Sequence, residues 1–167
     1  MCKESPFSYQ IRKGISVKEK DTFTVKLNSY FGLARNDYLY AKNSVDIGRS
    51  IGSFNVGAVL CAQSAEKFFK AVIELCFAED EDLLSMLHSN SLCALYNKIT
   101  TKYSLAVNSR DCRWLGDFYF DACYPGDNFT VVSEDDMKEC LNLTEHIMDD
   151  VTQILTKEQK LQDKVRE

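Results

Sequence analysis

Proline is almost absent from this sequence, which has two prolines in 167 residues and none between Pro6 and Pro125. Because proline breaks a helix in its interior, its absence over this span permits long helices. Apolar residues recur there at intervals of three and four, which is the spacing of a helix that buries one face. The sequence therefore predicts an all-α protein.

Long apolar runs are missing as well. The longest, Val56 to Ala62, is far shorter than the roughly 20 residues of a membrane-spanning helix. The first residues, "MCKESPF", have no apolar stretch after their charges, which is unlike a signal peptide. We therefore expect a cytoplasmic protein that makes no membrane contact.

Histidine and paired cysteine, which often carry catalysis and metal binding, are scarce. The chain has two histidines, His88 and His146, and its seven cysteines form no C-x-x-C pair. His146, Asp149 and Asp150 would share one side of a helix, but without a fourth ligand they predict an exposed charged face. Phosphate-loop, dinucleotide, zinc-protease and hydrolase motifs are also lacking. The sequence predicts no catalytic residue, no metal and no cofactor.

Positive charge is scarce outside the N-terminal segment. The first 30 residues hold six Lys and Arg against three Asp and Glu, whereas the remainder holds 14 against 22, and the formal net charge is −5. An acidic body repels phosphate backbones, so contact with RNA is expected to be weak and confined to the basic N-terminal segment.

Five segments show helical spacing of apolar residues. The second and the fifth have the longest apolar stripes and are expected to be the most buried. The fourth should end where Pro125 disfavours helical geometry in Tyr124, and Gly126 should free the backbone to turn. Short connections predict an antiparallel up-and-down bundle of about five helices. These helices are expected to begin near Leu27, Phe54, Leu92, Ser109 and Glu134.

The segments on either side of the bundle differ from it. Residues 1–26 alternate and are rich in β-branched side chains, which predicts a short β-hairpin or an irregular N-terminal arm. Residues 27–157 form the expected bundle, and residues 158–167 form a charged C-terminal tail that projects or frays. Val56, Val59 and Phe69 lie outside the main stripe of the second helix, so they could meet another helix or a second copy of the chain.

The second predicted helix carries two lysines on one side. Glu66 lies four residues before Lys70, in the favourable order for an ion pair, and one interpretation is that these charges form a solvated face. The alternative is an anion site that the fourth helix completes, with an affinity of about 10 μM to 1 mM for a nucleotide. Cys123 is a further candidate, as a reactive thiol. The candidate binding residues are Lys67, Lys70, Arg110, Arg113 and Tyr124.

Two stretches, "QSAEKFFKA" and the later "CYPGD", resemble the HEPN family, whose members have a "QxAEKxxKA" type of helix and a later "RYP" segment. The similarity covers about residues 30 to 156. It implies a helical bundle that pairs as a homodimer. For members encoded beside a minimal nucleotidyltransferase, it also implies a non-catalytic partner in a pair like a toxin and its antitoxin.

Two departures from the family pattern concern function. Cys123 stands where many members have arginine, and Asn90-Ser91-Leu92 stands where many have His-x-Leu. Ribonuclease members carry an arginine four to six residues before a histidine, and neither histidine here has one. Three functions remain open: a non-catalytic module that binds a nucleotide or a protein partner, a diverged ribonuclease toxin acting on RNA, and a purely structural dimerisation module.

Overall fold

The structure, a computed structural model, describes residues 26–166, with side chains placed up to residue 161. These residues form six helices and no strand, so the expected all-α bundle is confirmed. The expected N-terminal arm lies outside the described residues, apart from Lys26. The helices are α1 (Tyr30–Ile51), α2 (Asn55–Cys76), α3 (Leu83–His88), α4 (Leu92–Thr100), α5 (Ser109–Asp121) and α6 (Glu134–Arg166).

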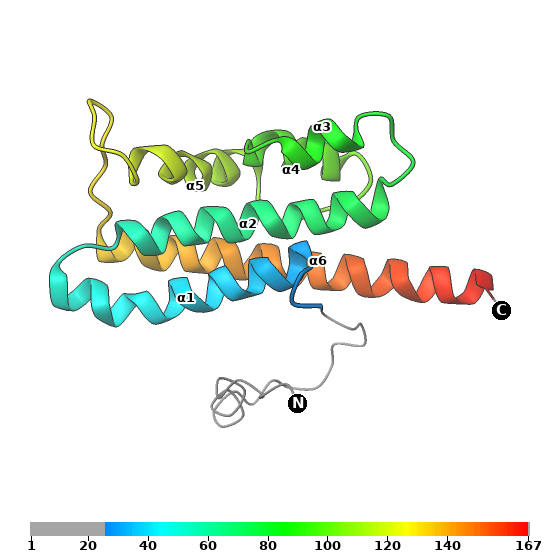
Figure 1. Cartoon of the computed structure of the whole chain (residues 1–167), viewed down its shortest axis with the longest axis horizontal. Coiled ribbons are helices and arrows are strands. Elements are labelled where there is room, and N and C mark those ends of the chain that lie inside the picture. The colour runs from blue at the N-terminus through cyan, green and yellow to red at the C-terminus, as the bar shows by residue number, and fades with distance from the viewer. Residues whose placement is uncertain (1–25, 167) are drawn as a thin grey trace, which may run out of the picture.

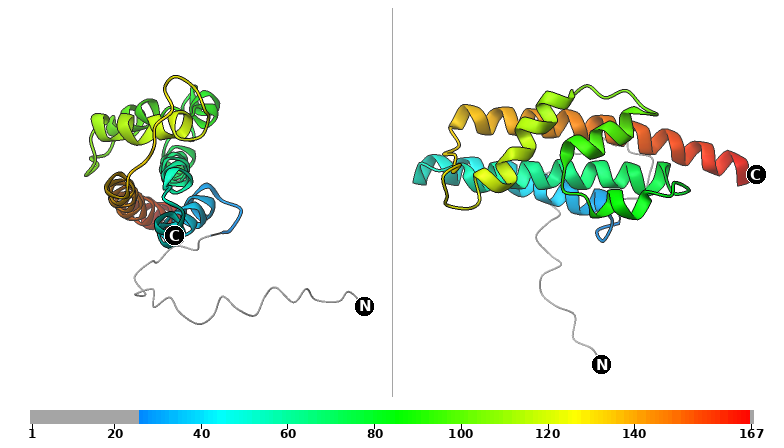
Figure 2. Two further views of the ribbon diagram at one scale, coloured as in Figure 1. Left: turned by 90° about the vertical axis from the view of Figure 1, so that its left-hand side faces the viewer. Right: turned by 90° about the horizontal axis from the view of Figure 1, so that it is seen from above.

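The central helix is α2, which contacts all the others (Figure 1). An end-on view shows α2 between the pair formed by α1 and α6 and a second layer that holds α4 and α5 (Figure 2). The α1–α2 hairpin is tight because Gly52 adopts a left-handed φ of 70° and its amide bonds to the carbonyl of Gly48. A side chain at Gly48 would collide with the ring of Phe54, so this turn requires glycine there.

The longest apolar stripes do supply the core. Phe68, Val72 and Ile73 of α2 and Val151 of α6 are fully buried, and the Phe68 ring packs edge-on against Phe31 of α1 at 5.1 Å. Of the two alternatives left open for Phe69, contact with another helix holds, because this side chain is fully buried too. A helix surrounded on several sides buries more than one stripe, and a single amphipathic face underestimates its core.

The remaining differences lie at the helix ends. The acidic segment after α2 is followed by α3, a short helix in addition to the five that were expected. Asp80 and Asp82 of this segment both form ion pairs with Lys98 of α4. The expected C-terminal tail continues α6 as helix to Arg166. At the other end of α6, Arg49 donates two hydrogen bonds to Glu134 and ties the end of α1 to the start of α6. Within the described part of the chain, no helix is long and apolar enough to cross a membrane.

Candidate ligand-binding site

Both lysines of the predicted anion site are held by carboxylates. The Lys70 ammonium lies 2.7 Å from Glu66, and the two side chains are only 7% and 15% exposed. Lys67 forms its ion pair across the helix interface, with Asp37 of α1. A phosphate would have to displace one of these carboxylates, so neither lysine offers an open positive charge.

The loop after α5 reaches α2 at the opposite end from these lysines. It docks on Asn55, the first residue of α2, whose amide donates to the carbonyls of Ala122 and Thr130 at 3.0 and 2.8 Å. The Asn55 side-chain oxygen accepts from the amide of Val132 at 3.0 Å. Sequence reasoning missed this clamp, because an asparagine near a helix start ordinarily predicts a cap of its own helix.

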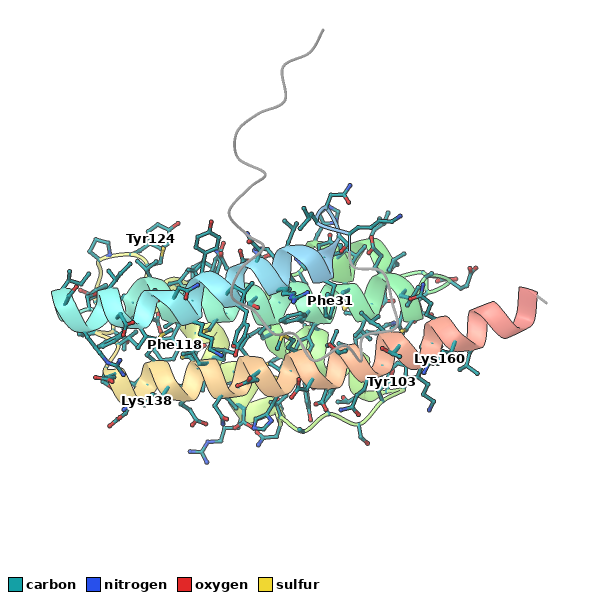
Figure 3. The ribbon with its side chains drawn as sticks, turned by 90° about the horizontal axis from the view of Figure 1, so that it is seen from below. Phe31, Tyr103, Phe118, Tyr124, Lys138 and Lys160 are labelled. Atoms are coloured by element: carbon teal, nitrogen blue, oxygen red, sulfur yellow. The ribbon has the colours of Figure 1, made fainter. Side chains whose placement is uncertain are left out.

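The expected cleft between Tyr124 and the two lysines is therefore not formed. Lys67 lies twelve residues beyond Asn55, which is about 18 Å along the helix axis. Tyr124 is 64% exposed, and its side chain lies at the end of the bundle where α1 leads into α2 (Figure 3). Helix α5 ends at Asp121, three residues before Tyr124, and Gly52 is the single described glycine with a positive φ. The turn at Gly126 thus does not use left-handed geometry.

A different site lies between the start of α4 and one face of α5. A cavity of about 550 Å³ opens there, and we call it the α4–α5 cavity. Its wall on the α4 side includes the segment where the family pattern has His-x-Leu. The lining residues are Asn90, Ser91, Leu92, Cys93, Cys112, Arg113, Gly116, Asp117, Phe120 and Asp121.

The local capping of the two helices fixes the walls of this cavity. Ser91 caps α4, and its hydroxyl accepts a hydrogen bond from the amide of Ala94 at 3.2 Å. Asn108 and Asp111 form a reciprocal capping box at the start of α5. The Cys93 thiol lies 3.5 Å from the carbonyl of Ser109 and joins the two helices. The cavity is thus built on helix ends whose backbone geometry is set locally.

The cavity contains one positive and two negative side chains. The Arg113 side chain is exposed and makes no hydrogen bond or ion pair with any described residue. Asp117 and Asp121 follow Arg113 at intervals of one helical turn, and the two carboxylates are both negative. Partial burial, and then the charge of Asp121, raises the pKa of the Asp117 carboxyl, while Arg113 acts in the opposite direction. The exposed ring of Phe120 borders the same space.

Of the five residues predicted from sequence, Arg113 alone lines the α4–α5 cavity. Arg110 lies on the same helix and is exposed outside it. Asn90, Asp117 and Phe120 were missed. The departure from the family's His-x-Leu pattern marked Asn90, but nothing in the sequence joins it to Asp117 and Phe120, because their proximity depends on how α4 packs on α5.

The histidines and the exposed cysteine lie apart from this site. The His88 ring nitrogen is 2.6 Å from the carbonyl of Leu84, within its own helix. Asp150, one of three residues weighed as metal ligands, accepts a hydrogen bond from the amide of Ala106 at 2.6 Å. The part of the chain that the structure describes holds no cluster of three or more metal-ligating side chains. Cys123 is exposed and does not line the cavity.

Comparison with known proteins adds one finding. The family model described as HEPN domain matches residues 29–155, which is most of the chain and nearly the whole helical bundle. Neither a curated protein nor a solved structure matches the chain.

Proposed function

Because the chain belongs to the HEPN family, we propose that it is a non-catalytic HEPN module that binds a nucleotide in the α4–α5 cavity. The observation that carries this proposal is the contrast between Arg113 and the lysines of α2. The Arg113 side chain is exposed and only its longer-range charge acts on Asp117, whereas Lys67 and Lys70 form direct ion pairs with Asp37 and Glu66.

The cavity offers contacts for both parts of a nucleotide. A guanidinium binds phosphate through paired N–H donors, and Arg113 lines the cavity together with the first turn of α4, the part of a helix where backbone amides lack helical partners. The ring of Phe120 offers a stacking surface for a base, and Asp117 or Asn90 can accept its N–H groups. The two carboxylates repel additional phosphates. We therefore expect AMP and GMP to bind at least as well as ATP and GTP.

The cavity holds two carboxylates, Asp117 and Asp121, but no histidine, the side chain that most often transfers protons in enzymes. Neither His88 nor His146 lines the cavity, and the pKa of the Cys112 thiol is raised to about 12 by burial. A ribonuclease needs a group that exchanges protons near neutral pH. The geometry thus favours binding over cleavage. Single-stranded RNA that is incubated with the protein should stay intact. Cleavage of this RNA that persists after nuclease-free purification and in the presence of a metal chelator would contradict the proposal.

The second part of the proposal concerns protein partners, and it is based on the family resemblance. A homodimer and a minimal nucleotidyltransferase are the partners that this resemblance implies, the latter in a pair like a toxin and its antitoxin. The nucleotidyltransferase can be tested by co-expression with the product of a neighbouring gene of that class. Co-elution of the two proteins at fixed stoichiometry would support it, and separate elution would count against it.

The nucleotide proposal is tested by matched arginine variants. Arg113→Ala should weaken AMP binding about ten- to a hundredfold, because one charge-assisted contact is worth roughly 1.5 to 3 kcal/mol. Arg110→Ala removes an exposed arginine of the same helix that does not line the cavity, and it should bind as the wild type does. Isothermal titration measures both. Equal affinities of the two variants would place the nucleotide elsewhere.

A further inference from the structure

Helix α1 exposes a line of large apolar side chains that the bundle does not use. Leu33, Tyr40 and Ile47 follow one another at intervals of seven residues and are 44%, 64% and 61% exposed. Ile51, four residues later, is 68% exposed. Seven residues are close to two helical turns, so these side chains form one stripe along the helix. The opposite side of α1 supplies the core through other residues, including Ala34, Tyr38 and Ala41.

The stripe is too large to be scattered surface apolarity. Val56, in the first turn of α2 after the hairpin, is also a large exposed apolar side chain, at 70%. The five side chains expose on the order of 500 Å² of apolar surface, which is at the upper end for a patch on a monomer. A standard interface uses about 800 Å² of each partner, so this stripe could form the apolar centre of one.

The charges beside the stripe allow a second copy to approach. The chain has a formal net charge of −5, and two copies should repel each other over most of their surfaces. Next to the stripe, however, Asp37 is neutralised by Lys67. The helix positions between the apolar side chains include the uncharged residues Asn36, Asn43 and Ser44. This face therefore brings apolar surface together without an excess of like charge.

We propose that α1 packs antiparallel against α1 of a second copy, about a two-fold axis that passes beside Tyr40. The stripe is self-complementary in this arrangement, because Leu33 and Ile47 lie seven residues on either side of Tyr40. Leu33 then meets Ile47 of the partner subunit, Asn36 meets Ser44 of the partner subunit, and the two Tyr40 rings meet at the axis. Antiparallel pairing also places opposite ends of the two helix dipoles together.

This interface differs from the one that the sequence suggested on α2. Phe69 is in the core and cannot contact a partner, and Val59 packs partly against the core. Val56 alone of those three residues remains available. The two-fold interface on α1 is independent of the α4–α5 cavity, since no stripe residue lines that cavity.

The mass of the full chain in solution tests the interface. Sedimentation at about 50 μM should show the wild type at twice the 19.1 kDa of one chain. The double variant Tyr40→Lys/Ile47→Lys should sediment as a monomer, because both substituted side chains are already exposed and the fold does not need them. Leu84→Lys, which replaces a leucine of α3 that is 69% exposed, is the control and should remain dimeric. A monomeric wild type, or a dimer that survives the double substitution, would overturn the proposal.

Cysteine cross-linking tests the antiparallel register, in a background where Cys2 and Cys123 are replaced by serine. Tyr40→Cys should form a disulfide with its own copy on mild oxidation, because both thiols lie beside the two-fold axis. Ile47→Cys alone should stay uncross-linked, whereas a mixture of Ile47→Cys and Leu33→Cys should cross-link. Self-cross-linking of Ile47→Cys without that of Tyr40→Cys would contradict the register.

Discussion

The side-chain amide of Asn55 donates a 2.8 Å hydrogen bond to the carbonyl of Thr130, which lies 75 residues later in the chain. With its bonds to Ala122 and Val132, this buried side chain fixes both ends of the loop that joins α5 to α6. The loop carries Tyr124 and Pro125, the segment that resembles the family's "RYP". Its position therefore depends on one residue at the start of α2, which also sets where α5 can end.

Asn55→Ala should destabilise the protein by about 3 kcal/mol, because it leaves buried backbone groups without partners. Urea unfolding followed by circular dichroism measures the change. Asn142→Ala, at an exposed position of α6, is the matched control and should cost less than about 0.5 kcal/mol. A loss in Asn55→Ala no larger than in this control would show that the clamp does not stabilise the fold.

Lys70→Met should destabilise the fold by about 3 kcal/mol and leave nucleotide affinity unchanged. The substitution strands the Glu66 carboxylate, which is only 15% exposed, without its partner. The double variant Glu66→Gln/Lys70→Met removes both charges and should recover most of the loss. Urea unfolding and titration with AMP separate the two roles. A stable Lys70→Met protein that no longer binds AMP would instead identify α2 as the phosphate site.

Titration of the Tyr38 hydroxyl should lower the free energy of unfolding as the pH rises from 10 to 12. Burial, and then the charge of Glu145, raises the pKa of its hydroxyl from 10.0 to about 12. Between these values the unfolded chain has released the proton and the folded chain retains it. The unfolded state then binds fewer protons, and the free energy of unfolding falls with pH.

Tyr38→Phe removes this titration and should give a shallower slope of unfolding free energy against pH in that range. Urea midpoints at pH 9, 10 and 11 measure the slope for both proteins. The buried thiols of Cys61 and Cys112, whose pKa values are also raised to about 12, are present in both and set a common background. Equal slopes would contradict the assignment to Tyr38.

The five longer helices could be predicted because each depends on local spacing, and the Glu66–Lys70 pair could be predicted because both residues lie on one helix. The pair between Lys67 and Asp37 joins two helices, and no spacing within either one reveals it. The same holds for the Asn55 clamp and for the α4–α5 cavity, where Asn90 and Asp117 meet through packing alone. Arg113 stays a predicted phosphate ligand, and its neighbours in the structure are Asn90 and Asp117 rather than Lys67 and Lys70.

The location of the bound nucleotide tests the central claim most directly. Titration of AMP into ¹⁵N-labelled protein, followed by amide chemical shifts, shows which backbone groups sense the ligand. The account expects the largest changes at Ser91, Leu92 and Cys93 and around Gly116, with little change at Lys67. Changes centred on residues 63–71, or none at millimolar AMP, would contradict it.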